Sequence, residues 1–393
     1  MTLATGPADD AMFAGNALTG ADRIDAGAGT NDQVGLLGDY TGANALVLQD
    51  GTLTNVEVIA ALADGGSYDI TSVDSTVASG QLLSVFGTNL SADQDLTFNG
   101  SAETDGAFLM YGGRGVDTLT GGAGNDGFFF GPDRWNTDDV VVGGAGSNDQ
   151  LALDGNYTVT LDAHAGVEVV ALLAGPEDNL NTFDVTLADT FIGAGETKTI
   201  FALGVQTDLR IDASGETDGN VRLFSGQGSD TLIGGSGNDT LFGGVGRDAL
   251  DGGAGNDIFA FNAAGDSAGL NYDTVAGFVR GEDVIQVNGQ VYNAYADVIG
   301  GRLDDSTFDA DLGTALNASL INGAAVFFTA DSGNHGGETF LVVDTNGIDG
   351  YQSGQDLVVN IVAAGAFQPV ALAEQIHVVA PMSEIVSVAP ILG

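Results

Sequence analysis

Two hydrophobic patterns recur along this chain of 393 residues. In the first, one apolar residue stands between glycine-rich turns at every ninth position: Leu232, Leu241, Leu250 and Phe259. In the second, apolar and β-branched residues alternate or cluster in short runs, as in residues 157–173 (YTVTLDAHAGVEVVALL), and Gly, Asn or Asp interrupts them. Both patterns are typical of short β-strands joined by turns. The chain is therefore predicted to be all-β.

Four nonapeptides follow one another in residues 225–260: SGQGSDTLI, GGSGNDTLF, GGVGRDALD and GGAGNDIFA. Each has an aspartate at its sixth position: Asp230, Asp239, Asp248 and Asp257. A second run, GGRGVDTLT and GGAGNDGFF, covers residues 112–129 and contains Asp117 and Asp126. Looser glycine turns occupy residues 26–32 and 143–149. A fixed period of this kind predicts a stack of repeats.

A longer unit is duplicated around these turns. Four segments recur in the same order at offsets of 111 to 117 residues: 26–34 with 143–151, 56–62 with 167–173, 101–106 with 214–219, and 112–126 with 225–239. We therefore expect two tandem repeat domains, residues 1–130 and 131–261.

The rest of the chain has a different pattern. Residues 262–365 hold strand-like runs such as AAVFF and TFLVV. Because a stack of repeats leaves an open sheet edge, we interpret them as a C-terminal β-rich capping domain. A helix is predicted within it over residues 308–323, where Leu312, Leu316 and Leu320 are four apart. Residues 366–393 form an apolar tail.

The net charge of the chain excludes some classes of binding protein. The chain has 54 acidic residues against 9 Lys and Arg, a formal charge of −45, and its single lysine is Lys198. Binding to nucleic acid or to an anionic membrane needs clustered basic residues, so both are excluded. The absence of cysteine excludes disulfides, thiolate metal sites and a cysteine nucleophile. Neither a signal peptide at the start of the sequence nor a transmembrane helix is expected.

The acidic residues are biased toward aspartate, with 44 Asp and 10 Glu. Aspartate favours turns because its short carboxylate reaches the neighbouring backbone. Turns rich in Asp and Gly offer many oxygen ligands, which suit a hard divalent cation, above all calcium.

The nonapeptide itself explains how such a cation could be held. Glycine allows a tight turn with inward-facing carbonyls, aspartate adds a charged oxygen, and the short strand buries one apolar side chain. Two nonapeptides make one coil, so turns 18 residues apart face each other. The facing carboxylates repel unless a cation lies between them. We therefore expect residues 225–260 to fold with calcium and to be disordered without it.

Residues 225–260, and less fully 112–129, resemble the secreted repeats-in-toxin (RTX) family of Gram-negative bacteria. The resemblance implies a right-handed parallel β-roll or β-helix with several calcium ions. Each ion would be held by the second and fourth carbonyls and the Asp of one turn, with the first and third carbonyls and the Asp of the turn 18 residues on. The implied ligands form two sets: Gly226, Gly228 and Asp230 with Gly243, Val245 and Asp248; and Gly235, Gly237 and Asp239 with Gly252, Ala254 and Asp257.

The second run departs from this pattern. Its candidate ligands are Gly113, Gly115, Asp117, Gly122, Gly124 and Asp126. The residues 18 positions beyond the two aspartates are Trp135 and Gly144, which offer no carboxylate. Coils lengthened by insertions would bring another acid opposite them: Asp105, Asp139 or Asp149.

Other segments carry looser resemblances. Residues 252–287 resemble the end of the β-roll of serralysin-type metalloproteases, although their HExxH zinc motif is absent. The duplicated unit resembles repeats of S-layer-like calcium proteins of alphaproteobacteria. The tail, residues 366–393, resembles the C-terminal export signal of type I secretion, while an edge-pairing role stays open.

Several single residues are candidate sites. Ser267 in GDSAG fits a nucleophile elbow, but a surface loop is favoured there. Asp344, Asn346 and Asp349 are interpreted as a hydrogen-bonded turn more readily than as a calcium loop. His335 is expected to be an exposed loop residue, and Trp135 to serve packing. For the first glycine turn, which contains Asp22, Asp25 and Asp32, calcium binding and a plain turn stay equally open.

Together these features predict a secreted calcium-binding structural protein of the bacterial cell surface that is not an enzyme. Its expected partners are calcium, the type I secretion machinery, and further copies of the chain in a lattice or filament, or a cell-surface glycan. The resemblance implies an extracellular location in a Gram-negative bacterium. Two alternatives stay open: an adhesin or matrix-binding module, and the non-catalytic β-roll of a secreted hydrolase.

Overall fold

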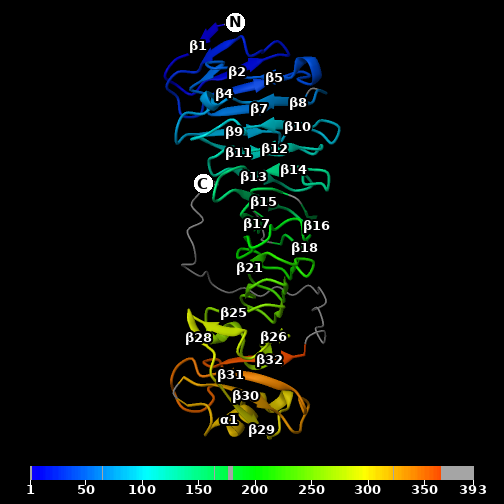
Figure 1. Ribbon diagram of the computed structural model, residues 1–393, viewed down its shortest axis with the longest axis vertical. Helices are drawn as coiled ribbons and strands as arrows, with labels where there is room; N and C mark the ends of the chain where they lie inside the picture. The colour runs from blue at the N-terminus through cyan, green and yellow to red at the C-terminus, as the bar shows by residue number, and fades with distance from the viewer. Residues whose placement is uncertain (1, 64, 163, 176–179, 322, 364–393) are drawn as a thin grey trace. The chain divides into compact units, whose positions relative to one another are not determined.

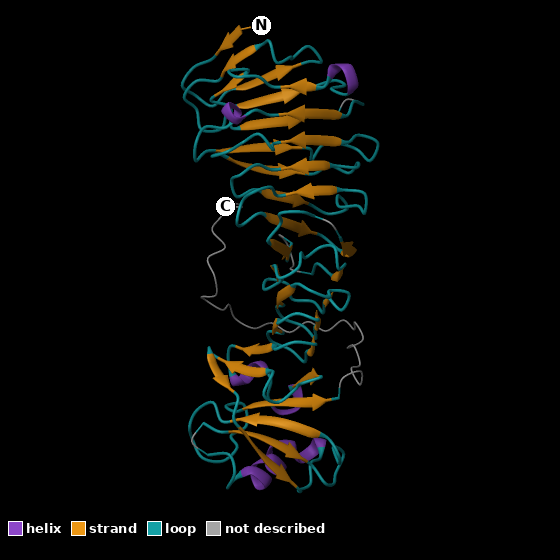
Figure 2. Cartoon of the chain, in the orientation of Figure 1, coloured by secondary structure: helices purple, strands orange, loops and turns teal. Residues whose placement is uncertain are grey.

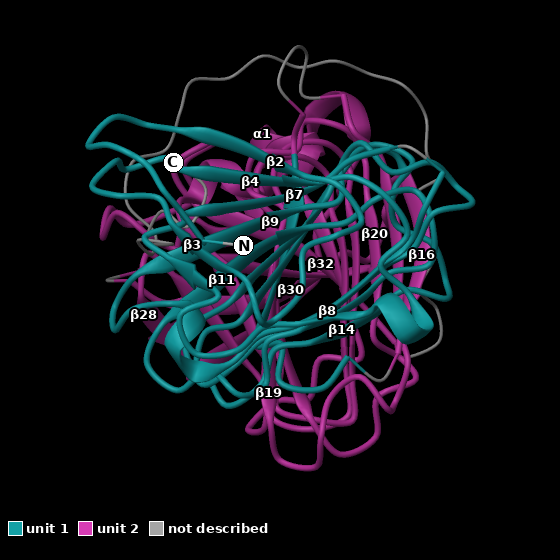
Figure 3. Ribbon diagram, turned by 90° about the horizontal axis from the view of Figure 1, so that it is seen from above, with its two compact units in different colours: residues 1–156, 164–173, 380–393 teal, residues 157–163, 174–379 magenta. Residues whose placement is uncertain are grey.

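The computed structural model describes residues 2–63, 65–162, 164–175, 180–321 and 323–363. Nearly every regular element in these ranges is a β-strand (Figures 1 and 2). The described chain forms two compact units, coloured separately in Figure 3. Unit 1 contains residues 2–156 and 164–173, and unit 2 contains residues 157–162, 174–175 and 180–363. The apolar tail predicted at 366–393 lies outside the described residues.

Unit 1 consists of parallel strands in three sheets, and consecutive strands alternate between sheets as the chain winds. The first sheet has three strands: β1 (Thr2–Ala4), β3 (Arg23–Asp25) and β6 (Leu53–Thr54). The second has five: β5 (Leu46–Val47), β8 (Tyr68–Thr71), β10 (Leu96–Asn99), β12 (Thr118–Thr120) and β14 (Val140–Val142). The third contributes eight strands to this unit: β2 (Ala11–Ala14), β4 (Gln33–Leu36), β7 (Val58–Ala61), β9 (Leu82–Phe86), β11 (Ala107–Tyr111), β13 (Gly127–Phe130), β15 (Gln150–Asp154) and β17 (Val169–Leu173).

Unit 2 continues with the same alternation between two sheets. One face has six strands: β19 (Thr197–Phe201), β21 (Asn220–Phe224), β23 (Thr240–Phe242), β25 (Ile258–Phe261), β27 (Val284–Val287) and β28 (Gln290–Tyr292). The other has ten, in the order β16 (Tyr157–Leu161), β18 (Phe183–Leu187), β20 (Arg210–Asp212), β22 (Thr231–Gly235), β24 (Ala249–Gly253), β26 (Asp273–Ala276), β32 (Leu357–Val362), β31 (Thr339–Val343), β30 (Ala325–Thr329) and β29 (Tyr295–Ile299). The predicted all-β parallel β-roll is thereby confirmed.

The core of the roll is made of apolar rows. In one row of unit 2, identical strand positions hold Leu223, Leu241, Phe259 and Ile285. In the opposite sheet the row holds Ile211, Leu232, Leu250 and Val275. All of these side chains are fully or almost fully buried. Each nonapeptide therefore contributes one side chain to a continuous core, as its single apolar position predicts.

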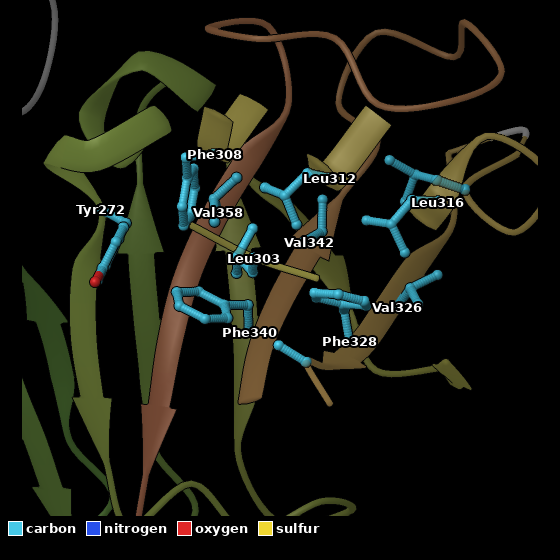
Figure 4. Close-up of a cluster of buried hydrophobic side chains, with 12 residues drawn as sticks. Tyr272, Leu303, Phe308, Leu312, Leu316, Val326, Phe328, Phe340, Val342 and Val358 are labelled. Atoms are coloured by element: carbon cyan, nitrogen blue, oxygen red, sulfur yellow. The ribbon is translucent and has the colours of Figure 1, made fainter. Parts of the chain in front are cut away.

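In the ten-stranded sheet, β32 adds in parallel to β26, and β31 and β30 follow antiparallel. In the other sheet, β27 still pairs in parallel with β25, and the antiparallel β28 follows it. The helices of this part of the chain are η3 (Ala264–Asp266), η4 (Gly269–Asn271), η5 (Asp305–Thr307) and α1 (Phe308–Leu316). Two further short helices belong to unit 1: η1 (Gly42–Asn44) and η2 (Asp74–Thr76). A separate core packs α1 against the sheet, with Leu312 and Leu316 facing Phe328 and Val342 (Figure 4).

The helix predicted over residues 308–323 is shorter than expected. It ends at Leu316, because the following NASLING segment is rich in residues with low helix propensity. The amides of Ser319 and Leu320 still donate to the Leu316 carbonyl, which gives one further turn and buries Leu320. The leucine spacing was thus a sign of burial beyond the end of the helix.

Candidate metal centres

The nonapeptide turns of unit 2 stack with a repeat of two nonapeptides. Strands β22 and β24 pair Leu232 with Leu250, so identical turn positions lie one above the other. This approach leaves no room at the fourth motif position: a β-carbon added at Gly246 would lie 1.6 Å from the carbonyl oxygen of Gly228. Glycine is required there because two backbones meet.

The first motif position faces the aspartate of its own turn. A β-carbon at Gly243 would lie 2.3 Å from Oδ2 of Asp248, and one at Gly252 would lie 2.2 Å from Oδ2 of Asp257. The first repeat has Ser225 at this position, and its Oγ donates to the Gly243 carbonyl at 2.5 Å. The glycine at the first position therefore lets the turn close around its own carboxylate.

The aspartates of stacked turns form hydrogen-bonded rows. In the first row, the amide of Asp230 donates to Oδ1 of Asp248 at 2.8 Å. The amide of Asp248 donates in turn to Oδ1 of Asp273 at 2.8 Å. The row begins where the Leu209 amide reaches Oδ1 of Asp230, and it ends where the Asp273 amide donates to Oγ of Ser267. Each carboxylate thus bridges two coils through backbone amides.

A second row follows the same rule on the other set of turns. The amide of Asp239 donates to Oδ1 of Asp257 at 2.9 Å, and that of Asp257 donates to Oδ1 of Asp283 at 3.0 Å. Val221 begins the row, since its amide donates to Oδ1 of Asp239. The amide of Val279 ends it at Oδ2 of Asp283.

Unit 1 contains two comparable rows with longer spacing. The amide of Asp117 donates to Oδ1 of Asp139, 22 residues on, and that of Asp126 donates to Oδ1 of Asp149, 23 residues on. The amide of Asp149 then donates to Oε2 of Glu168. The prediction that insertion-bearing coils bring Asp139 and Asp149 opposite the aspartates of this run is confirmed.

Burial sets the electrostatics of these rows. Loss of hydration raises the pKa of Asp126 and Asp239 to about 6, and that of Asp117 and Asp257 to about 7. The Asp248 carboxyl, which is almost fully buried, has a pKa well above its ordinary value because of burial and the charges of its row neighbours. The charged form of such carboxyls is unfavourable inside the fold unless a cation lies beside it.

The two ligand sets implied for unit 2 come together in the stacked turns. The amide of Val245 donates to the Gly226 carbonyl at 3.0 Å, and the amide of Ala254 donates to the Gly235 carbonyl at 2.8 Å. These two carbonyls, implied as ligands, each keep a second lone pair. The other implied ligands lie in the same turns: Gly228, Asp230, Gly237, Asp239, Gly243, Asp248, Gly252 and Asp257.

The ligands predicted in unit 1 gather around their own aspartates. The amide of Gly113 donates to Oδ2 of Asp117 at 2.6 Å, and the amide of Gly122 donates to Oδ2 of Asp126 at 2.8 Å. The remaining predicted ligands of this run lie in the same two turns: Gly115 and Gly124. Metal binding by these residues stays a prediction.

The donor set fits calcium. All candidate donors are carboxylate or carbonyl oxygens, the ligands that calcium prefers. Some carboxylates of the rows keep a buried oxygen without a hydrogen-bond partner, among them Oδ2 of Asp32, Asp248 and Asp273. Buried polar atoms in proteins are nearly always satisfied, so such oxygens point to a missing partner. Arg247, the arginine of the nonapeptides in residues 225–260, lies over the ring of Tyr272.

The surface loop expected at Ser267 is wrong, because this residue lies inside the fold. Its side chain is fully buried, its Oγ donates to the Val358 carbonyl at 2.5 Å, and it accepts the amide of Asp273. No histidine nitrogen forms a hydrogen bond with this hydroxyl in the described part of the chain. The hydroxyl therefore ends the first row and joins it to β32.

His335 corrects one expectation, because it is buried and not exposed. Its ring packs against Tyr272, Phe308 and Phe340 with centroids 5.5 to 6.1 Å away. Its two nitrogens contact carboxylate oxygens of Asp305 and Glu338. Aromatic packing thus draws the loop inward. Trp135 packs as predicted, edge to face with Phe130 and His164.

The carboxylates of the remaining candidate turns accept hydrogen bonds from different groups. Asp344 accepts the amides of Gly347 and Gly323 on its two oxygens, which favours the plain turn over a calcium loop. In the first glycine turn, Oδ2 of Asp22 accepts from Thr19, and Oδ1 of Asp25 accepts the side chain of Asn55. Asp32 instead joins a row: it accepts the amide of Asp10, and its own amide donates to Glu57.

Sequence reasoning missed the acids that complete these rows. Asp273 and Asp283 lie 25 and 26 residues beyond their row neighbours, so the insertions hid them from a nine-residue period. Glu57 and Glu168 were visible only as part of the duplicated VEV block. Two buried glutamates in the other duplicated block, Glu103 and Glu216, were also missed.

Comparison with known families agrees with this geometry. The family model of the RTX calcium-binding nonapeptide repeat, which describes four copies, matches residues 109–133 and 224–259. No curated protein matches the chain. The matched segments are the glycine turns that carry the aspartate rows, so the chain contains RTX calcium-binding repeats. None of the helices in the described ranges has the length and apolar character of a membrane span.

Proposed function

We propose that this chain is a secreted calcium-binding structural protein of the bacterial cell surface, whose β-roll forms when calcium binds. One observation carries the proposal: the row of Asp230, Asp248 and Asp273 is 1% exposed or less along its length, and the charge of Arg247, which acts on Asp273, offsets only part of its negative charge. Three dehydrated carboxylates in one row oppose folding unless protons or cations neutralise them.

Calcium supplies this neutralisation only where it is abundant. An ion that binds only the folded chain adds about 2.7 kcal/mol at 100 times its Kd. Extracellular calcium modules have Kd values of about 10⁻⁴–10⁻³ M, so they are filled outside the cell and empty in the cytosol. Proteins with RTX repeats are typically secreted. A chain that stays unfolded until export and folds outside is consistent with both facts.

Circular dichroism of the full chain across a calcium titration tests the proposal. We expect β structure to appear cooperatively in the millimolar range and to disappear in excess chelator. A matched pair of variants locates the effect: Asp248→Asn should shift the midpoint to higher calcium, whereas Asp133→Asn, an exposed acid outside the rows, should not. An unchanged β spectrum in chelator would overturn the proposal.

The proposed structural role is supported by the exposed strands at the edges of the sheets. Strand β2 stands at the end of its sheet and exposes 79% of Phe13, and β29 stands at the end of another sheet and exposes 83% of Ile299. Edges of this kind are templates for pairing with a second copy. Electron microscopy with and without millimolar calcium tests this part: calcium-dependent sheets or filaments support assembly, and monodisperse particles contradict it.

A further inference from the structure

Two acidic clusters lie outside the nonapeptides. The first consists of Asp74, Glu103 and Asp105, and the second of Asp189, Glu216 and Asp218. Within each cluster, one carboxylate oxygen from every residue lies within 4.8 Å of the others. We call them the ETDG clusters, because the last two acids of each come from the duplicated segments SAETDG and SGETDG.

The central glutamate of each cluster is buried, and one of its carboxylate oxygens has no hydrogen-bond partner. Glu103 and Glu216 are each 1% exposed, and the Oε2 atom of each has no hydrogen-bond partner. Their Oε1 atoms are held by backbone amides: that of Gly106 at 2.9 Å for Glu103, and that of Gly219 at 2.8 Å for Glu216. A carboxylate fixed by one oxygen and left unpaired at the other indicates a cationic partner.

The flanking aspartate is held in place by the same turn. In the first cluster, the amide and the hydroxyl of Thr104 donate to Oδ1 of Asp74, at 2.9 and 2.5 Å. In the second, the amide and the hydroxyl of Thr217 donate to Oδ1 of Asp189, at 3.0 and 2.6 Å. The aspartate therefore has a fixed position on the preceding coil, although it is exposed.

The backbone around the two clusters is also the same. The amide of Gly80 donates to the carbonyl of Asp105 at 2.8 Å, and the amide of Gly195 donates to the carbonyl of Asp218 at 2.8 Å. The same bonds in both copies show that the arrangement belongs to the duplicated unit and not to one loop.

No lysine or arginine of the described chain forms an ion pair with any of the six carboxylates. Three carboxylates around one point suit a divalent cation, and irregular oxygen ligands with a charge of −3 suit calcium better than the strictly octahedral magnesium. We propose that each ETDG cluster binds one calcium ion, in addition to any ions in the glycine turns. The inference rests on the proposed function, since it needs the chain to bind calcium.

The two glutamates could instead contribute only to the neighbouring glycine turns, and this role has to be distinguished from calcium binding in the ETDG clusters. The charge of Glu103 acts on Asp126, and that of Glu216 acts on Asp239, so each glutamate also lies near a glycine turn. If the glutamates served only those turns, the aspartates of the preceding coil, Asp74 and Asp189, would be irrelevant to calcium binding. Variants of these aspartates therefore decide between the two roles.

The test is the number of calcium ions bound by the full chain, measured by calorimetry and by equilibrium dialysis. We expect Asp74→Asn with Asp189→Asn to lower the number by two, because asparagine keeps the Oδ1 acceptor for threonine but removes the charge. Glu103→Gln with Glu216→Gln should lower it by at least two. Asp133→Asn, which removes an exposed charge elsewhere, should leave it unchanged.

The outcomes separate the inference from the proposed function. Unchanged stoichiometry in the aspartate pair overturns the inference while wild-type calcium binding upholds the proposed function. Loss of ions in the glutamate pair alone overturns it too. A wild-type chain that binds no calcium overturns both. If the aspartate pair does not fold at any calcium concentration, the single variants Asp74→Asn and Asp189→Asn should each lose one ion, and two unchanged counts overturn the inference.

Discussion

The aspartate rows of unit 2 and unit 1 differ in the sequence spacing of their residues but share the same hydrogen-bond pattern. Row neighbours Asp230 and Asp248 are 18 residues apart, whereas Asp126 and Asp149 are 23 apart. The hydrogen bond from the amide of one aspartate to Oδ1 of the next is nevertheless the same in both. The row is therefore specified by the stacking of the turns, and an insertion elsewhere in the coil leaves it intact.

One row of unit 2 ends differently from the row of Asp126 and Asp149 in unit 1. In unit 2 the first row ends on the neutral hydroxyl of Ser267, whereas in unit 1 the row of Asp126 and Asp149 ends on the carboxylate of Glu168. In the first row of unit 2, burial raises the pKa of Asp248 and of Asp273 well above the ordinary value, and the charges of their row neighbours raise it further. We therefore expect unit 2 to depend more strongly on calcium than unit 1.

The largest effect is expected when one row charge is removed: the variant should fold less readily than the wild type at a given calcium concentration, but more readily in chelator. Asp248→Asn should weaken calcium binding about tenfold or more, because a charged ligand is lost. In chelator the same variant should retain more β structure than the wild type, because a dehydrated charge has been removed. Calcium titrations followed by circular dichroism measure both.

The matched variant Asp126→Asn applies the same change to the longer coil of unit 1. Both effects should be smaller there, since burial raises the pKa of Asp126 only to about 6. Equal effects in the two variants would remove the distinction between the units.

The next effect concerns the close approach of the backbones. Gly246→Ala should destabilise the calcium-loaded chain by about 3 kcal/mol, because its β-carbon would meet the Gly228 carbonyl oxygen at 1.6 Å. Gly265→Ala has open space around its β-carbon and should change stability by less than about 0.5 kcal/mol. Chemical denaturation at saturating calcium compares the two. A neutral Gly246→Ala would show that the stacked turns can separate without cost.

The sequence was sufficient where the period was regular. The nine-residue repeat predicted the roll, its apolar rows and the aspartates that face each other in unit 2. It could not locate Asp273 or Asp283, because the inserted segments before them break the period and only the closed backbone brings them into line. His335 was misjudged for a related reason: its SGNHGGE context indicates a loop, and the aromatic partners that bury it come from elsewhere in the chain.

A smaller effect follows from the raised pKa values. Between about pH 4 and pH 7 the folded chain binds more protons than the unfolded one, because the pKa of Asp117 and Asp257 is raised to about 7. Stability without calcium is therefore present at low pH and is lost as the pH rises through this range. Protons and calcium compete for the same carboxylates, so calcium affinity should rise over the same range. Thermal unfolding in chelator from pH 4 to 8 measures the first trend, and a flat profile contradicts it.

The smallest effect tests how the first row ends. Ser267→Ala leaves the Asp273 amide and the Val358 carbonyl without the hydroxyl that joins them, which should cost about 1–2 kcal/mol in calcium-loaded stability. Glu168→Gln keeps an oxygen acceptor at the end of the corresponding row in unit 1 and should cost less. An esterase assay of both the wild type and Ser267→Ala accompanies the denaturation curves. Activity that disappears with the hydroxyl while stability is unchanged would replace the structural role of Ser267 with a catalytic one.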